Sequence, residues 1–312
     1  MMKNEIILEG NCLYTPQGAA REYAAVGCNF YRGCPFQCRY CYNRKGMTAK
    51  VMGVDHGVLK DCFTNRDLRP KKYREISDDN YAMRCFVEEF RKHEEYLKQT
   101  GVFFSFSTDP MLSETHLLTL RAASFCAHRG VSVTILTKSV FPFQLLDEWF
   151  GHPESTGDDH FKEYVSFGFT LTGRDDVEEE AARSHSSNAE RIGAMRRLDE
   201  LGYRTWASIE PIVDFDSSYR MIEQTVGFCR HYKIGLMSKR GKEYPPYDKT
   251  ACASFIRVVT DLMFEYYVPG QSFQGRRTVY WKESIRKFVA DDAISMAYIW
   301  NSLCSVSRDW RL

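Results

Sequence analysis

The chain has 312 residues, of which 44% are hydrophobic and 14% aromatic; this is enough for a substantial core and argues against a disordered protein. Its 42 basic and 41 acidic residues nearly cancel, so net charge does not support a nucleic-acid partner but leaves a nucleic-acid substrate open. Glu9 and Gly10 break the short apolar run near the N-terminus, so it is neither a signal peptide nor a spanning helix. We therefore predict a cytoplasmic protein without a membrane partner.

The first predicted strand lies within residues 23–33 and leads into a cluster of three cysteines. Cys34, Cys38 and Cys41 have the spacing Cys-x3-Cys-x2-Cys. A reducing cytosol favours metal ligation over disulfides for such a cluster, and thiolates select zinc or iron–sulfur clusters. Structural zinc normally takes a fourth ligand with its own paired spacing, and no second CxxC or HxxxH pattern follows. Three ligands to a [4Fe-4S] cluster would instead leave one iron open for chemistry.

The other eight cysteines are scattered along the chain. We predict that most of them are buried small hydrophobic residues. This interpretation is clearest for Cys85, Cys126 and Cys229, which lie in apolar helical patterns.

After a polar segment at residues 44–77, the chain alternates between strand and helix patterns. Strands are predicted at 102–107, 131–139, 164–172, 203–213 and 234–239, and helices at 114–130, 143–150, 188–202 and 218–233. Counted from the cysteine loop, this pattern predicts an α/β fold, a partial (βα)6 TIM-like barrel, with its site at the carboxyl ends of the strands. We predict an N-terminal segment at 1–22, the barrel at 23–240 and a C-terminal extension at 241–312 that completes or caps it.

Four successive strand ends carry polar side chains. They are Ser107-Thr108-Asp109, Thr137-Lys138-Ser139, Thr170-Leu171-Thr172 and Ser208-Ile209-Glu210. Any one of these residues could be a helix N-cap, because Ser, Thr and Asp are common there. Polar groups at four strand ends in one register favour a binding site.

The cysteine spacing, with Tyr40 before the last cysteine, resembles the signature of the radical S-adenosylmethionine (SAM) superfamily. In that superfamily the loop follows the first strand of a partial βα barrel. From about residue 24 to residue 213, the chain resembles the branch around spore photoproduct lyase. The likeness runs through GCPFQCRYCY, FSFSTDP, VTILTKS, FTLTG, NAER and ELGYRTWASIEPIVD.

The resemblance implies Cys34, Cys38 and Cys41 as ligands of a [4Fe-4S] cluster whose open iron is chelated by the amino and carboxylate groups of SAM. It also implies a set of residues around SAM. These are Tyr40, Ser107, Thr108, Asp109, Lys138, Ser139, Thr170, Thr172, Arg191 and Glu210. Arg191 and Glu210 could equally be solvent-facing side chains.

By the same resemblance, the protein is an enzyme that cleaves SAM reductively. The resulting 5′-deoxyadenosyl radical would abstract hydrogen from an unidentified substrate, which could be related to nucleic acids. A reductant such as flavodoxin or ferredoxin would supply the electron. The alternatives are a structural zinc protein and an iron–sulfur protein that only transfers electrons.

Two departures from known relatives restrict the specific reaction. Spore photoproduct lyases carry a hydrogen-donating cysteine on the second strand, where residues 102–109, VFFSFSTD, contain none. We therefore predict no repair of spore photoproduct. The absence of a second CxxC cluster in the sequence also disfavours the peptide-modifying enzymes that carry auxiliary clusters.

The C-terminal extension shows a predicted helix at 250–267 and a final helical segment. Between them lies a group of basic and aromatic residues: Arg276, Arg277, Tyr280, Trp281 and Lys282. These side chains would suit stacking on a base or contact with a phosphate. They would equally suit a closing strand whose alternate residues face solvent.

Overall fold

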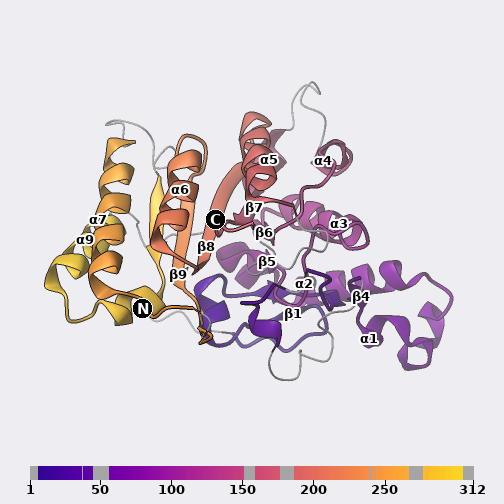
Figure 1. Cartoon of the computed structure of the whole chain (residues 1–312). Helices are drawn as coiled ribbons and strands as arrows, with labels where there is room; N and C mark the ends of the chain where they lie inside the picture. Colours follow the sequence, from indigo (N-terminus) through magenta and orange to yellow (C-terminus); the bar gives the residue numbers. More distant parts are fainter. Residues whose placement is uncertain are drawn as a thin grey trace. The chain divides into compact units, whose positions relative to one another are not determined.

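The structure, a computed structural model, describes residues 6–36, 38–44, 56–150, 159–175, 186–238, 240–242, 244–266 and 277–304. The chain forms two compact units (Figure 1). The first comprises residues 1–37, 43–166 and 311–312, and the second comprises residues 38–42 and 167–310. The predicted division at 22/23 and 240/241 stays a prediction.

The first unit contains the N-terminal strands, the first long helix and the start of the main sheet. Its elements are β1 (Leu13–Tyr14), β2 (Gly27–Cys28), β3 (Tyr31–Arg32), β4 (Val58–Leu59), α1 (Asp61–Thr64), α2 (Asp78–Thr100), β5 (Val102–Phe104), α3 (His116–Ala127), β6 (Val133–Thr137) and α4 (Gln144–Phe150). The strand predicted within 23–33 is therefore two short strands, of which β2 joins the main sheet and β3 pairs with β4.

Helix α2 packs the aromatic core of the first unit. Its Phe86 ring lies 5.7 Å from the ring of Phe30, 6.4 Å from that of Phe104 and 6.2 Å from that of Phe125. The helix ends at Gly101, whose φ of +70° favours glycine. A Cβ at that position would come within 2.8 Å of the Ser132 carbonyl oxygen, so Gly101 also lets β5 follow the helix closely beside the start of β6.

Glu89 of α2 holds the N-terminal segment in place through hydrogen bonds to its backbone. Its carboxylate accepts hydrogen bonds from the backbone N–H groups of Asn11 (2.7 Å), Cys12 (3.0 Å) and Leu13 (2.8 Å). A Cβ on Gly10 would lie 2.2 Å from one carboxylate oxygen, so glycine is needed where the backbone passes over it. Three successive donors on one anion make this contact the main anchor of β1.

We expect the substitution Glu89→Gln to lower the free energy of unfolding by about 2 kcal/mol, because one amide group would face backbone N–H donors and charge-assisted bonds would be lost. Chemical denaturation monitored by circular dichroism measures the change. Glu88→Gln is the matched control, since Glu88 is exposed and pairs with the exposed Arg84 at 3.3 Å. Equal stability of the two variants would contradict the anchoring role of Glu89.

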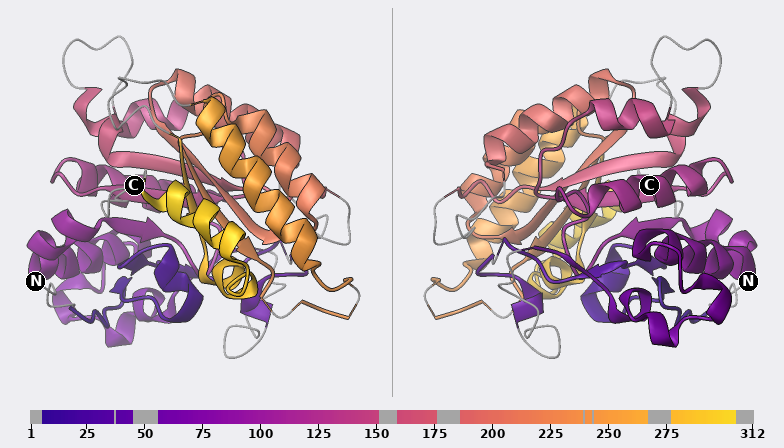
Figure 2. Two further views of the ribbon diagram at one scale, coloured as in Figure 1. Left: turned by 90° about the vertical axis from the view of Figure 1, so that its left-hand side faces the viewer. Right: turned by 90° about the vertical axis from the view of Figure 1, so that its right-hand side faces the viewer.

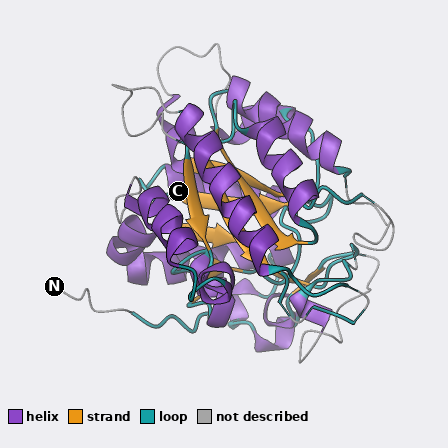
Figure 3. Ribbon diagram, turned by 60° about the vertical axis from the view of Figure 1, so that its left-hand side comes forward, coloured by secondary structure: helices purple, strands orange, loops and turns teal. Residues whose placement is uncertain are grey.

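The second unit contains the remaining strands and the helices that cover them. Its elements are β7 (Val165–Thr170, which begins in the first unit), α5 (Asn188–Glu200), β8 (Arg204–Ile212), α6 (Phe215–Thr225), β9 (His231–Leu236), α7 (Lys249–Glu265), β10 (Thr278–Trp281), α8 (Glu283–Phe288) and α9 (Ala293–Cys304). Figure 2 shows α5, α6 and α7 side by side over the strands, and Figure 3 shows the same layering of helices on strands.

The predicted helix at 218–233 and strand at 234–239 are wrong in their boundaries. Helix α6 ends at Thr225, and β9 begins at His231, within the predicted helix. Gly227 weakens a helix at this point. The segment from His231 becomes a strand because it pairs in parallel with both β8 and β10, and its Tyr232 hydroxyl contacts Thr225 Oγ1 at 2.8 Å.

The main sheet has the strand order β1-β2-β5-β6-β7-β8-β9-β10. β1 is antiparallel to β2, whereas the pairs β2–β5, β5–β6, β8–β9 and β9–β10 are parallel. This mostly parallel sheet with intervening helices confirms the predicted α/β class of partial-barrel type. None of the helices in the described part of the chain is long and apolar enough to span a membrane.

Candidate functional site

The cysteine loop follows β2 and β3, as the sequence predicts. Cys34 and Cys41 are half-buried and Cys38 is buried, and none of the three forms a disulfide bond. The Cys41 N–H donates to the Cys38 carbonyl oxygen at 3.0 Å, which closes a turn around Tyr40. Cys34 belongs to the first unit and the other two cysteines to the second. Within the described ranges, no group of three or more His, Cys, Asp or Glu side chains is arranged to hold a metal ion, so shared ligation stays a prediction.

The described cysteines outside this loop are chemically unlike metal ligands. Burial raises the pKa of seven of these thiols: Cys12, Cys28, Cys62, Cys85, Cys126, Cys229 and Cys252. A raised pKa keeps the sulfur protonated, whereas a metal ligand must be a thiolate. Among the described cysteines, Cys34, Cys38 and Cys41 stay the predicted ligands of an iron–sulfur group.

Asp109 joins the end of β5 to the end of β6. Its Oδ1 accepts from the Thr137 hydroxyl at 2.7 Å, the Met111 N–H at 3.0 Å and the Ser139 hydroxyl at 3.3 Å. Its Oδ2 accepts from the Lys138 N–H at 2.7 Å. Burial raises the pKa of Asp109, and the donors from Thr137, Lys138 and Met111 oppose that rise. The structure thus brings together three predicted site residues, with Asp109 accepting from the backbone N–H of Lys138 and from the side-chain hydroxyl of Ser139.

Thr108 is the described residue at this strand end with an unused polar atom. The residue is 8% exposed, and its Oγ1 has no hydrogen-bond partner among the described residues. A buried hydroxyl without a partner is costly, so it indicates a place for a ligand atom. The neighbouring Ser107 differs, because its hydroxyl donates to the Tyr31 carbonyl oxygen at 2.6 Å and serves the backbone of β3.

We expect Asp109→Asn to lower the free energy of unfolding by about 2 kcal/mol, because an amide –NH2 would face the Lys138 N–H or the hydroxyl donors. Thermal or urea denaturation measures the loss. Asp261→Asn, at an exposed position of α7, provides the control. If Asp109→Asn were as stable as this control, the hydrogen bonds to Asp109 would not hold the two strand ends.

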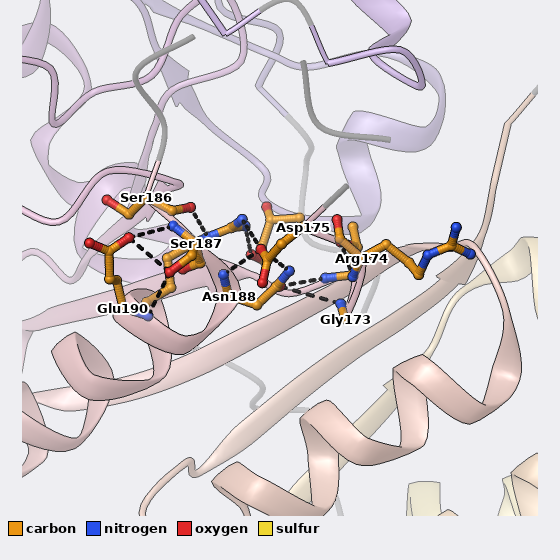
Figure 4. A network of polar contacts seen from close by, with 10 residues as sticks. Gly173, Arg174, Asp175, Ser186, Ser187, Asn188 and Glu190 are labelled. Atoms are coloured by element: carbon orange, nitrogen blue, oxygen red, sulfur yellow. Dashed lines mark hydrogen bonds and ion pairs between the residues drawn. The ribbon is translucent and has the colours of Figure 1, made fainter. Parts of the chain in front are cut away.

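The end of β7 is held by a polar network around Asn188 at the start of α5 (Figure 4). Asn188 Oδ1 accepts from the N–H groups of Thr172 (3.1 Å) and Gly173 (3.3 Å), and its backbone N–H and Nδ2 both donate to Asp175 Oδ1 at 2.7 Å. Ser187 and Glu190 form a capping box that begins the helix. This network uses the Thr172 backbone N–H to hold the strand end.

Arg191 is fully buried, so its interpretation as a solvent-facing side chain is wrong. Its Nε donates to the Ser186 carbonyl oxygen at 2.9 Å, and Nη1 donates to the carbonyl oxygen of Thr170. Its Nη2 lies 3.9 Å from Asp175 Oδ1. Arg191 therefore braces the backbone at the end of β7, and a direct contact with SAM stays a prediction for it and for Thr170.

Glu210, near the end of β8, pairs with Lys282 directly after β10. Lys282 Nζ lies 2.5 Å from Glu210 Oε2, and the exposed fractions of the two side chains are 2% for Lys282 and 17% for Glu210. Sequence reasoning missed this pair because the two residues are 72 positions apart. The available signal for this pair in the sequence was Lys282, a basic residue directly after the segment that forms the closing strand.

Strand β10 decides between the two interpretations of the basic and aromatic group. Trp281 and Lys282 are buried, and Arg277 donates to the carbonyl oxygens of Val226 (2.9 Å) and Gly227 (2.6 Å). Arg276 lies outside the described residues. Of the described members of the group, Tyr280 and Trp281 lie in β10 and Arg277 and Lys282 flank it, so the group belongs to the strand that closes the sheet.

No family model matches the chain, and no curated protein sequence matches it significantly. Its structure is similar to spore photoproduct lyase complexed with dinucleoside spore photoproduct, with a TM-score of 0.51 and 14% identity over 93% of this chain and 78% of that one. A double mutant of that lyase with bound AdoMet and the same dinucleoside gives 0.50, with the same identity and coverage. Streptococcus suis SuiB gives 0.49 and 11% identity over 83% of this chain and 50% of that one. The fold likeness to spore photoproduct lyase that the sequence predicts is thereby confirmed.

Proposed function

Because the chain has the fold of spore photoproduct lyase, we propose that it is a radical SAM enzyme. The observation that carries the proposal is the Cys34, Cys38 and Cys41 loop, which follows the first parallel strand of that fold. When bound, a [4Fe-4S] cluster and SAM supply reductive cleavage and a 5′-deoxyadenosyl radical that abstracts hydrogen from the substrate. The protein contributes ligands, orientation and exclusion of water.

Some residues at the strand ends would contact the cluster or SAM, and others hold the backbone around those contacts. We assign the cluster to the three cysteines, with Tyr40 packing beside it. Thr108 Oγ1 is a buried hydroxyl at a strand end without a hydrogen-bond partner among the described residues, so it is the best-supported contact for a polar group of SAM. Lys138 can neutralise the carboxylate of SAM, since its ammonium is a compact positive charge at a strand end.

The remaining assigned residues position these contacts or line the site. Asp109 holds the backbone N–H of Lys138 and accepts from the Ser139 hydroxyl, and Arg191 holds the carbonyl of Thr170. Ser107, Thr172 and Glu210 lie at the same ends of their strands, where this fold class places its sites. All of them stay assigned to the SAM site.

The substrate differs from that of the lyase it resembles in fold. Residues 102–109 contain no cysteine, and Phe106 stacks on Phe103 with ring centroids 4.4 Å apart. We predict no repair of spore photoproduct, which assay of the reconstituted protein with a synthetic dinucleotide would check. A flavodoxin or ferredoxin is the proposed reductant. None of the ten cysteines whose side chains the structure describes forms a disulfide bond, which suits a reducing, cytoplasmic location.

Anaerobic reconstitution with iron and sulfide, followed by dithionite and SAM, tests the function. Chromatography should detect 5′-deoxyadenosine, and iron and sulfide analysis should detect the cluster. Zinc without sulfide would replace the proposal with a structural zinc site. A cluster whose electron paramagnetic resonance spectrum does not respond to SAM would replace it with electron transfer alone.

A further inference from the structure

The guanidinium of Arg240 joins the loop after β9 to the carboxyl end of β8, within the second unit. Its Nη2 donates to the carbonyl oxygen of Val213, the residue directly after β8, at 3.0 Å. Its Nε donates to the carbonyl oxygen of Pro245, farther along the same loop, at 2.7 Å. The side chain therefore lies at the strand edge where this fold class places its binding sites.

Two tyrosines hold this guanidinium in place. Its Cζ lies 3.9 Å from the ring centroid of Tyr247 and 5.2 Å from that of Tyr244. Tyr247 is itself fixed between two strand ends, because its hydroxyl donates to the Ile212 carbonyl oxygen and accepts from the Met237 N–H at 3.0 Å. A cation that is stacked on a ring and bonded to two carbonyls has lost most of its rotational freedom before a ligand arrives.

The third nitrogen of the guanidinium has unused hydrogen-bonding capacity. Arg240 Nη1 is buried and has no hydrogen-bond partner among the described residues, although it carries two N–H groups. A buried donor without a partner is costly, and the cost is larger on a charged group. Holding the loop against β8 uses only Nε and Nη2, so Nη1 indicates a place for an acceptor atom of a ligand.

The charge of Arg240 indicates what kind of ligand this is. Arg240 is half-buried, and its two acceptors are neutral carbonyl groups. Within the described ranges no carboxylate pairs with it, and that of Asp214, next to Val213 in the chain, pairs with Arg174 at 3.3 Å. Charges that are withdrawn from water are normally paired, so a ligand at Nη1 would be an anion. Arginine suits the oxygen atoms of phosphate and carboxylate groups.

We propose that Arg240 forms an oxyanion-binding site at the carboxyl ends of β8 and β9, which takes the phosphate or carboxylate group of a ligand. The site lies wholly within the second unit. The inference goes beyond the proposed function, because it requires neither the cluster nor SAM. The two carbonyls and the two tyrosines position the guanidinium, and Nη1 donates to the anion.

The test is thermal denaturation of the full chain at constant ionic strength, with inorganic phosphate and acetate as the two probes. A probe that binds should raise the melting temperature of the wild type. Arg240→Met should weaken this binding about tenfold, because a charge-assisted hydrogen bond is lost. Arg240→Lys should not restore it, since one ammonium cannot serve two carbonyls and a ligand. Arg257→Met, which removes an exposed arginine of α7, is the matched control and should respond like the wild type.

The two probes also distinguish the ligand classes. A response to phosphate that depends on Arg240 assigns a phosphate group, and one to acetate assigns a carboxylate. Equal responses of the wild type and Arg240→Met would overturn the inference, because the anions would then act on the protein surface in general. No response of the wild type to either probe would overturn it as well.

A second measurement decides the matter if Arg240→Met does not fold. The Nε–H resonance of Arg240 in the ¹⁵N-labelled wild type, identified by its absence in Arg240→Lys, should shift as the bound probe is titrated. A resonance that does not move during the titration would show that Arg240 only holds the loop, and the inference would be wrong. Formation of 5′-deoxyadenosine is a separate measurement and tests the proposed function alone.

Discussion

Replacing Cys38 with alanine is expected to reduce 5′-deoxyadenosine formation to background and to remove the bound iron and sulfide. A [4Fe-4S] cluster with one open iron needs three thiolate ligands, and this substitution leaves two. The turn at this position is made by backbone groups, because the Cys38 carbonyl oxygen accepts the Cys41 N–H. The variant should therefore fold and lack only the sulfur.

Iron and sulfide analysis, absorption spectroscopy and product chromatography measure this loss after identical anaerobic reconstitution. Cys126→Ala is the matched control, because Cys126 is a buried thiol of α3 whose pKa is raised by burial. It should keep the cluster and the product at a stability cost of about 1 kcal/mol. Full iron and sulfide content with undiminished product in Cys38→Ala would refute the assignment of Cys38.

The second large effect is expected at Gly168 of β7, where alanine should lower the free energy of unfolding by about 3 kcal/mol. A Cβ there would lie 2.0 Å from Cε2 and 2.4 Å from Nε1 of Trp206 on β8. The Trp206 ring is fully buried and has Lys233 Nζ 5.6 Å from its centroid, so it cannot easily move away. Because Gly168 has no side chain, it leaves the space that the indole ring of Trp206 occupies.

Gly193→Ala is the control for that substitution. Gly193 lies inside α5, and a Cβ built there meets nothing within 4 Å. Alanine should raise the free energy of unfolding by up to about 1 kcal/mol, because glycine is the weaker helix former. Urea denaturation of both variants measures the contrast. Similar stabilities would show that the sheet adjusts around Trp206, contrary to this expectation.

The sequence predicted most strands and helices of the main sheet because their hydrophobic patterns are local. β6, for example, lies within the predicted strand at 131–139, and α5 begins at the predicted residue, Asn188. The pattern failed at residues 218–233, where an amphipathic run continues into residues that pair as β9. Strand pairing, which the local pattern does not contain, decided that boundary.

The site residues also separate into those that a local pattern predicts and those that depend on long-range contacts. The cysteine loop and the polar strand ends could be found because each depends on residue types within a few positions. The sequence did not distinguish the side chains that would contact a cofactor from those that hold the backbone in place. Asp109 binds residues 28 to 30 positions away, and Arg191 is buried against the carbonyl of Thr170, which is 21 positions away. Only folding reveals which polar atoms these distant partners consume and that Thr108 Oγ1 keeps unused capacity.

By itself, the sequence determined the fold class, the three clustered thiols and the register of polar strand ends. Covalent spacing and side-chain alternation fix these features before any long-range contact forms. The tertiary structure alone decided that β10 closes the sheet and that Lys282 therefore lies beside Glu210. The physical reason is that strand pairing sets neighbours by hydrogen-bond register between distant segments, and burial then selects which charges must be paired.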